Sequence, residues 1–290
     1  MTVILNQQTA KALQPPRDEH QAKWQFGRTA LVCGSAGMAG AALLSTHSAL
    51  RSGAGLVQLC AVEEVIAAAR IAVPEALLLP VDRSETGVIA QTAAPLLLQQ
   101  AEKAQSLLFG CGAGITRHGS SLLSTLCSGY EGTLVLDADG LNLLSENTAL
   151  LYKVSERCVL TPHIGEFCRL SGMTRQQAEA HPQRAATDFA AKYRCVLVLK
   201  GATTVVTDGN TAYVLDCPNS GMAKGGSGDV LAGLTAGLCA QMPHKPLESA
   251  ALAVWLHSRA GQLARQQYGA RAMLPRDVVQ ALGQAFLELE

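Results

Sequence analysis

Short apolar runs alternate with helical patterns along almost the whole chain from residue 28 onward. Each run is rich in apolar residues and is followed by glycine or polar residues, which is typical of a buried strand. The expected strands are 29–34, 55–62, 76–81, 106–110, 133–137, 158–161, 195–200, 203–207 and 212–215. The first expected helix follows a glycine-rich turn that begins at residue 34, and it ends at residue 50. The other expected helices are 63–72, 92–104, 120–127, 164–171, 175–193, 227–242, 247–267 and 276–288. This alternation predicts an α/β fold with a mostly parallel sheet that helices cover on both faces.

The chain of 290 residues contains no linker, repeat or low-complexity segment that would divide it. We therefore expect one domain over residues 1–290, with residues 1–27 forming an N-terminal arm or a first short helix. The last two expected strands are separated by Asp208-Gly209-Asn210, which is typical of a hairpin turn, so these two strands should pair in an antiparallel manner.

Glycine and polar residues recur just after the ends of the expected strands. They occur at Gly34, Gly110–Gly114, Asp137–Gly140, Pro162–Glu166 and Lys200–Gly201. The carboxyl ends of parallel strands lie at one edge of a sheet, and this edge is where ligands bind in open α/β folds. The sequence therefore predicts one shared cleft rather than a series of unrelated turns.

A glycine-rich stretch, Asn219–Gly233 (NSGMAKGGSGDVLAG), is the strongest candidate for a binding loop. Its glycines allow a tight turn with exposed N–H groups, and a helix that starts near Ser227 would direct its positive end to the same point. Backbone donors combined with a helix N-terminus form an anion site, most often for phosphate. Asp229 cannot bind phosphate, but it can accept a proton from an attacking hydroxyl group. The alternative is a carboxylate that only stabilises the start of a helix.

Composition excludes several classes of function. Lysine plus arginine and aspartate plus glutamate both number 23, and aromatic residues make up only 4%, so we expect no nucleic-acid partner. The nine cysteines are widely spaced without a CxxC pair, which indicates buried thiols in a reducing compartment. Neither a signal peptide nor a long apolar segment is evident, so we expect no membrane association and a cytoplasmic location.

Six motifs in series resemble the NAD(P)H-hydrate dehydratases, the domain of YjeF-type proteins. They are GSAGMAGAALLS (34–45), FGCGAG (109–114), LDADGLNLL (136–144), LTPHIGE (160–166), VLVLKGATTVV (196–206) and the glycine-rich stretch. The resemblance runs from about residue 28 to 288. It implies a ribokinase-like, three-layer α/β/α fold and repair of the hydrated forms of NADH and NADPH.

The same resemblance implies the co-substrates and partners. Bacterial members use ADP and release AMP and phosphate, eukaryotic members use ATP, and Mg²⁺ is expected. A homo-oligomer, a tetramer in the family, is implied as well. Many relatives carry an NAD(P)H-hydrate epimerase domain in front; only about 27 residues precede the match here, so we expect the epimerase to be a separate protein.

The resemblance also implies residue roles. Asp229 is the base for the hydroxyl group of the hydrate, and His163 contacts the nicotinamide hydrate. Ala41 and Gly112 or Gly114 meet the dinucleotide, and Glu166 reaches Mg²⁺ through water. The nucleotide is bound by Lys200, Gly201, Ala202, Thr203 and Thr204 and by Gly225, Gly226, Ser227 and Gly228.

Three alternatives remain open at this point. Asp137, Asp139 and Asn142 could orient magnesium or nucleotide phosphates, or they could form a turn with a helix cap at Asp139. The chain could be a small-molecule kinase of the ribokinase-like superfamily, of the hydroxyethylthiazole or hydroxymethylpyrimidine type. Such a kinase shares the glycine loop, Gly225–Gly228, and the base. It could also be a nucleotide-binding regulator without turnover, although such a protein would not need Asp229.

Overall fold

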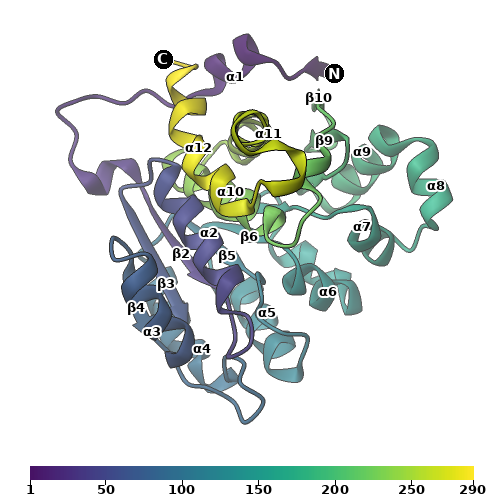
Figure 1. Ribbon diagram of the computed structural model, residues 1–290. Coiled ribbons are helices and arrows are strands. Elements are labelled where there is room, and N and C mark those ends of the chain that lie inside the picture. Colours follow the sequence, from purple (N-terminus) through teal and green to yellow (C-terminus); the bar gives the residue numbers. More distant parts are fainter.

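A computed structural model describes residues 1–290, and its centre is one ten-stranded sheet (Figure 1). The strand order is β1-β10-β9-β8-β7-β6-β5-β2-β3-β4. Strand β9 is antiparallel to both of its neighbours, and all other pairs are parallel. The strands are β1 Thr2–Ile4, β2 Arg28–Val32, β3 Leu56–Ala61, β4 Leu77–Pro80, β5 Ser106–Phe109, β6 Thr133–Leu136, β7 Cys158–Leu160, β8 Val196–Leu199, β9 Thr203–Thr207 and β10 Ala212–Asp216. The predicted mostly parallel sheet and the β9–β10 hairpin are confirmed.

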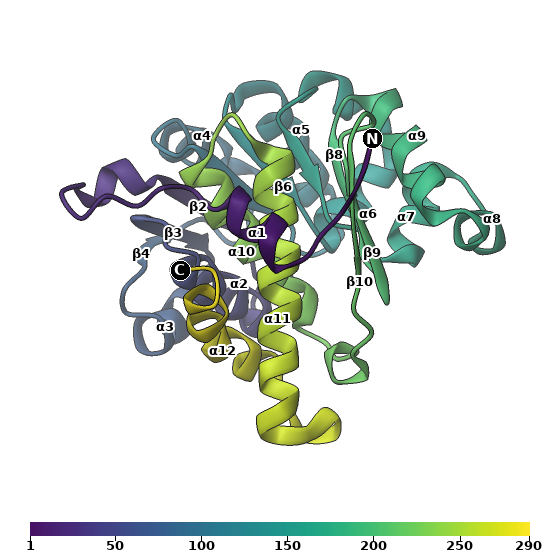
Figure 2. The same cartoon turned by 90° about the horizontal axis from the view of Figure 1, so that it is seen from above.

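Helices cover both faces of the sheet. Figure 2 shows α4, α5 and α9 on the opposite side of the sheet from α2, α11 and α12. The helices are α1 Gln7–Leu13, α2 Ala39–Arg51, α3 Glu63–Ala72, α4 Ala94–Ala101, α5 Arg117–Gly129, α6 Asp139–Glu146, α7 Ile164–Ser171, α8 Arg175–Ala180, α9 Pro182–Tyr193, α10 Ser227–Gln241, α11 Pro246–Ala272 and α12 Pro275–Leu287. Short 3₁₀ turns lie at Lys23–Phe26, Gln91–Ala93, Thr148–Lys153 and Ser220–Met222. None of these helices combines the length and the apolar character needed to cross a membrane.

The core lies on both faces of the central strands. Every residue of β5, β6, β7 and β8 is buried, as the continuous apolar runs predicted. Helix α10 is buried almost all round because it lies between the sheet and helices α2 and α11. Gly233 and Gly237 have no side chain where α10 meets α2, and a Cβ atom on either would collide with α2 or the residue that follows it. The glycine-rich helix is therefore held firmly in the middle of the protein.

Three local features differ from the sequence-based expectation. Residues 1–27 contain the expected short helix, α1, but also β1, which extends the sheet beside β10. The expected helix 175–193 is two helices, because His181 precedes Pro182 and takes a non-helical conformation with φ −142°. Helix α6, which is absent from the expected helices, follows the turn after Asp137.

The register of the parallel strands brings their carboxyl ends to one line. Val32 pairs with Phe109, Phe109 with Leu136, and Leu160 with Leu197. Beyond the ends of β7 and β8, an isolated parallel bridge joins His163 to Lys200. The predicted shared edge is therefore present, and the glycine and polar residues that follow the strands lie along it.

Candidate active site

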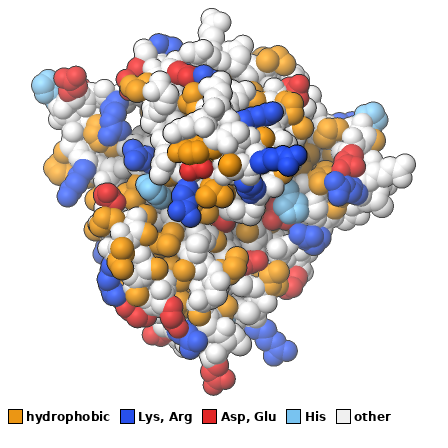
Figure 3. Space-filling model, viewed as in Figure 1, with side chains coloured by type: hydrophobic (Ala, Val, Ile, Leu, Met, Phe, Trp, Pro, Cys, Tyr) orange, Lys and Arg blue, Asp and Glu red, His pale blue; other side chains and the backbone are white.

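A cavity of about 1010 Å³ opens at this edge, between the strand ends and the start of α10. We call it the strand-end cavity. Residues after β5, β6, β7 and β8 line one side of it, and the glycine loop and α11 line the other. The volume of this cavity is at the upper end of the range for small-molecule sites. Two extended molecules can share the cavity if part of each remains in solvent. On the face shown in Figure 3, charged side chains of both signs are interspersed.

The glycine loop offers N–H groups that can bind an anion. Gly226 adopts φ 99° and stands at the N-cap position of α10, which begins at Ser227 as predicted. The N–H groups of Gly225, Gly226, Gly228 and Asp229 donate to no group of the chain, whereas the Ser227 N–H donates to the Lys224 carbonyl. Free N–H groups at the start of a 15-residue helix provide both donors and a positive partial charge for a phosphate group.

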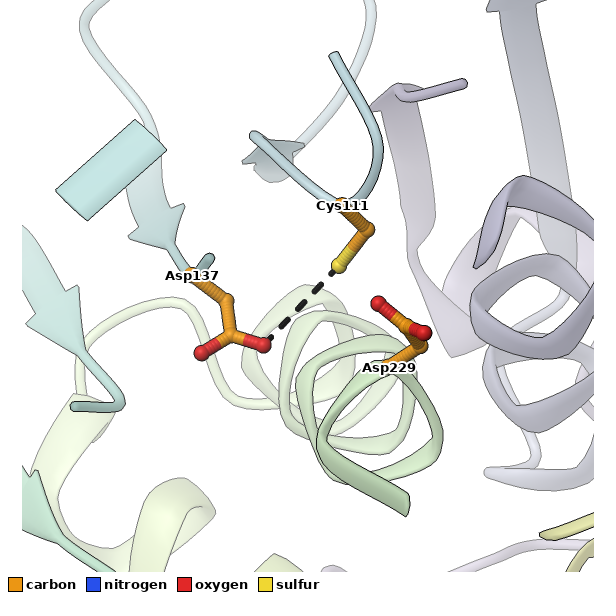
Figure 4. Close-up of side chains that lie close together, drawn as sticks. All are labelled: Cys111, Asp137 and Asp229. Atoms are coloured by element: carbon orange, nitrogen blue, oxygen red, sulfur yellow. Dashed lines mark hydrogen bonds between the residues drawn. The ribbon is translucent and has the colours of Figure 1, made fainter. Parts of the chain in front are cut away.

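Asp229 lies in the first turn of α10, opposite the ends of β5 and β6. Figure 4 shows its carboxylate beside the side chains of Cys111 and Asp137. One carboxylate oxygen of Asp229, one of Asp137 and the Cys111 Sγ atom all lie within 4.8 Å of one another. The pKa of Asp229 is raised to about 6, first by burial and then by the charge of Asp137, while a hydrogen bond from Cys111 and the charge of Lys200 oppose the increase. A carboxylate with this pKa is ionised near neutral pH and is still a useful proton acceptor.

Lys200 follows β8 and crosses the strand ends to Asp137. Its Nζ atom lies 2.9 Å from Asp137 Oδ1 and 4.0 Å from Glu166 Oε2. Burial alone would lower the pKa of Lys200, but the two carboxylates outweigh burial and the net shift is upward. Asp137 is buried and also accepts a hydrogen bond from the Thr161 hydroxyl at 2.8 Å. The ammonium group is therefore fixed beside the glycine loop, where an ideal Cβ on Gly228 would lie 3.3 Å from Nζ.

His163 and Glu166 form a reciprocal pair at the start of α7. The His163 Nδ1 atom accepts hydrogen bonds from the N–H groups of Gly165 and Glu166, and Glu166 Oε2 accepts one from the His163 N–H at 2.8 Å. Because Nδ1 is an acceptor, the neutral ring carries its proton on Nε2, which lies 3.6 Å from Glu166 Oε1. Burial raises the pKa of Glu166, and the Lys200 charge partly offsets this increase.

Most of the candidate residues named from the sequence line the strand-end cavity, but three do not. The residues at the cavity are Gly112, His163, Glu166, Lys200, Gly201, Ala202, Thr204 and Gly225–Asp229. Ala41 lies behind Gly112, with its Cβ 3.1 Å from an ideal Cβ on that glycine. The Gly114 N–H donates to Asp139 Oδ2 at 2.8 Å, and the Thr203 hydroxyl donates to Asp216 Oδ1 at 2.7 Å.

The carboxylate and amide side chains after β6 are bound to other parts of the protein. Asp137 is held by Lys200 and Thr161, Asp139 accepts the Gly114 N–H, and Asn142 accepts a hydrogen bond from the Arg169 side chain at 2.9 Å. The segment forms a turn and the start of α6, and Asp137 and Asp139 also line the strand-end cavity. Asp139 is in the first turn of α6, while the N-cap position itself is Ala138.

Three further residues, Cys111, Met38 and His257, lie at the site without a role assigned from the sequence. Met38 and His257 line the cavity from α2's N-cap position and from α11. Burial lowers the pKa of His257 to about 4, so this imidazole is neutral near pH 7. Met38 and Cys111 belong to two of the motifs quoted above but had no separate role there, and His257 belongs to none of them. All three reach the site through the packing of α11 and of the turns after β2 and β5.

Residues 29–284 match the protein family described as NAD(P)H-hydrate dehydratase. An ADP-dependent (S)-NAD(P)H-hydrate dehydratase from Neisseria meningitidis is 34% identical over 89% of this chain and 84% of that protein. A bifunctional NAD(P)H-hydrate repair enzyme from Moorella thermoacetica is 35% identical over 95% of this chain and 52% of that protein. The chain thus spans about half the length of the bifunctional relatives that it matches.

Solved structures show the same architecture. A ribokinase-like superfamily protein from Enterococcus faecalis superposes with a TM-score of 0.85 at 28% identity, covering 99% of this chain and 96% of that one. The ADP/ATP-dependent NAD(P)H-hydrate dehydratase from Bacillus subtilis, co-crystallised with ATP and Mg²⁺, gives a TM-score of 0.82 at 25% identity, with 99% and 98% covered. The expected ribokinase-like α/β/α fold is confirmed.

Proposed function

This chain belongs to the NAD(P)H-hydrate dehydratase family, and we propose that it dehydrates (6S)-NAD(P)H hydrate in an ADP-dependent reaction. The products are NAD(P)H, AMP and phosphate, so the reaction repairs a damaged nicotinamide cofactor. The observation that carries this proposal is the position of Asp229. Its carboxylate stands within one turn of a helix whose free N–H groups can hold a phosphate, so a base and a phosphate cradle share one cavity.

In the proposed mechanism, phosphoryl transfer prepares the leaving group. Asp229 accepts the proton of the hydrate hydroxyl group while the oxygen of that hydroxyl attacks the terminal phosphorus of ADP. AMP is the leaving group. The glycine-loop N–H groups and Lys200 neutralise charge on the transferred phosphoryl group. The lone pair of the ring nitrogen then expels phosphate from the hydrated carbon. Loss of a proton from the neighbouring carbon restores the ring of NAD(P)H.

We assign the two ligands to opposite sides of the strand-end cavity. The nucleotide side consists of Lys200–Thr204 and Gly225–Gly228, and the hydrate side consists of His163 and the turn that contains Gly112. Ala41, Gly114 and Thr203 act from behind these surfaces in this proposal, because each is packed or hydrogen-bonded away from the cavity. Their contribution is to the shape of the turns.

We propose that Mg²⁺ enters with the nucleotide phosphates. Glu166 is the residue that fits a water-mediated contact, because its carboxylate lines the cavity and oxygen ligands suit this ion. Asp137 fits less well, because Lys200 and Thr161 both donate to its oxygen Oδ1 and the Cys111 thiol lies 4.0 Å from Oδ2. When bound, Mg²⁺ would neutralise part of the charge on the nucleotide phosphates. We further propose a homo-oligomer, and a separate NAD(P)H-hydrate epimerase that supplies the (6S) form.

The proposed activity is tested by recovery of the reduced-nicotinamide absorbance. Hydrated NADH or NADPH is mixed with the protein, Mg²⁺ and either ADP or ATP. We expect absorbance to return faster with ADP, with one AMP and one phosphate formed for each NAD(P)H. Equal or faster recovery with ATP would refute the choice of donor. A phosphorylated product without return of absorbance would instead support the small-molecule kinase alternative.

The side of the cavity on which His163 acts can be tested by two substitutions. His163→Asn keeps a side chain that can cap α7, whereas His163→Ala removes both the ring and the cap. We expect both variants to raise the KM for the hydrate with little change in ADP affinity, because the ring is placed on the hydrate side. We expect only His163→Ala to lower stability, by about 1 kcal/mol. Reduced ADP affinity with a normal KM for the hydrate would place His163 on the nucleotide side.

A further inference from the structure

The thiol of Cys111 lies between two carboxylates, that of the proposed base Asp229 and that of Asp137, the partner of Lys200. It follows β5 in the turn that leads to Gly112, and its side chain is fully buried. The Sγ atom lies 4.0 Å from Asp137 Oδ2, and Figure 4 shows the Asp229 carboxylate on its other side. A buried thiol has one proton to donate, and the two carboxylates compete for it with the sulfur of Cys33.

The thiol itself stays protonated in this position. A hydrogen bond with Cys33 raises the pKa of Cys111 well above its ordinary value, and burial and the charges of Asp229 and Asp137 raise it further. A thiol of this kind is neither a nucleophile nor a ligand for Mg²⁺, which prefers oxygen. Donation of its S–H proton is the chemistry that remains available to it.

The two acceptors differ in what else holds them. Asp137 also accepts hydrogen bonds from Lys200 and Thr161. Asp229 forms no salt bridge, and the Cys111 Sγ atom lies within 4.8 Å of one of its carboxylate oxygens. Asp229 therefore depends on Cys111 more strongly than Asp137 does. Loss of the donor would leave two buried carboxylates facing each other with only Lys200 to offset their repulsion.

We propose that Cys111 is a positioning residue for the base: its S–H proton is shared between Asp137 and Asp229, favours the ionised form of Asp229 and keeps its carboxylate directed toward the glycine loop. When Asp229 accepts the hydroxyl proton, the S–H group turns fully to Asp137. When the proton leaves, the S–H group is shared again. No bond to sulfur forms or breaks in this cycle. The catalytic part of this inference rests on the proposed function, whereas the hydrogen bond itself does not.

The charged and titratable groups that face Asp229 are Cys111 and Asp137, with Lys200 after β8 and Asp139 in α6 at longer range. Cys33, at the end of β2, faces Cys111. Lys200 opposes the effect of the two aspartates, so removal of the thiol alone should move the acid limb of the activity profile upward. The free energy of an ordinary hydrogen bond corresponds to a change of about half a unit to one unit in the apparent pKa of this acid limb.

The test compares three substitutions at one position. Cys111→Ser keeps a donor, Cys111→Ala removes donor and volume, and Cys111→Val removes the donor but restores volume. We expect Ala and Val to raise the apparent pKa of the acid limb of kcat/KM by about half to one unit, so that activity at pH 6 falls about twofold to fivefold further than in the wild type. Ser should retain the wild-type profile. Cys158→Ala is the matched control, since this buried thiol lies at the opposite end of its strand from the site.

A simple space-filling role for Cys111 predicts the reverse order, with Val close to the wild type and Ser no better than Ala. That order, or an acid limb that does not move in any variant, would overturn the proposal. Variants that fail to fold are covered by a measurement on the wild-type protein. The infrared S–H stretching band should change as the pH falls through about 6, because Asp229 becomes protonated there.

The same infrared titration of Asp229→Asn should lose this change. A wild-type S–H band that stays constant across the titration would contradict the shared hydrogen bond whatever the activity of the protein. An S–H band that responds in a protein without dehydratase activity would leave the hydrogen bond standing and refute only the proposed function. The two failures are therefore distinguishable.

Discussion

Asp229→Asn is expected to abolish most turnover while the protein remains folded and binds ADP. The amide cannot accept the hydroxyl proton, and loss of a general base costs about 10²–10⁴-fold in rate. Asparagine keeps the shape of the side chain and removes a negative charge beside the expected phosphates. ADP affinity, measured by calorimetry, should therefore be unchanged or slightly higher, whereas kcat for absorbance recovery falls.

The direction of the stability change follows from the raised pKa. The folded protein binds a proton at Asp229 more tightly than the unfolded chain does. The stability that this proton provides is therefore lost as the pH rises from about 4 to about 6, and the loss stays constant above that range. Asparagine has no such cost. We expect the melting temperature of Asp229→Asn at neutral pH to equal or exceed that of the wild type.

Asp277→Asn is the matched control for this prediction. Asp277 is the third residue of α12, as Asp229 is of α10, and it caps the Leu274 N–H away from the strand-end cavity. Its substitution should lower stability slightly and leave turnover unchanged. If Asp229→Asn retained more than about a tenth of wild-type turnover, Asp229 would not be the base. Early melting together with loss of ADP binding would show that Asp229 only stabilises the start of α10.

The sequence predicts the sheet well because its strands are buried on both faces. Such strands are continuous apolar runs with glycine or polar residues behind them, and this signal does not depend on distant contacts. Two of the misses have local causes. Strand β1 has only three residues, and α8 and α9 are separated by a single residue before Pro182. Helix α6 lies in the LDADGLNLL motif, where the sequence shows turn residues and an apolar helix pattern together.

The candidate site divides in the same way. The glycine loop and Asp229 are recognisable because one continuous segment carries both the free N–H groups and the carboxylate. The contacts that adjust Asp229 come from Cys111 and Asp137, which follow the different strands β5 and β6 and are distant from Asp229 in sequence. Only the order of strands in the sheet places them together. The network around a base is therefore harder to predict than the base itself.

Lys200→Met should cause the second large loss, because Lys200 acts on both the phosphate and the buried carboxylates. A charged hydrogen bond contributes about 1.5–3 kcal/mol, so ADP affinity should fall by about one to two orders of magnitude. The substitution also leaves Asp137 buried with the Thr161 hydroxyl and the Cys111 thiol, a loss that typically destabilises a protein by about 3–5 kcal/mol. Because the Lys200 ammonium is itself partly exposed, we expect the lower end of that range. Calorimetry with ADP and urea unfolding measure the two effects.

The double variant Lys200→Met/Asp137→Asn separates these effects. Asparagine removes the unpaired charge, so stability should recover in large part, whereas ADP affinity should stay low because the cation beside the glycine loop is still absent. Lys192→Met, on the exposed face of α9, should change neither quantity. Wild-type ADP affinity in Lys200→Met would mean that the ammonium group serves the fold alone. If the double variant recovered both stability and affinity, the glycine-loop N–H groups would be sufficient to hold the phosphate, and Lys200 would be present only to neutralise Asp137.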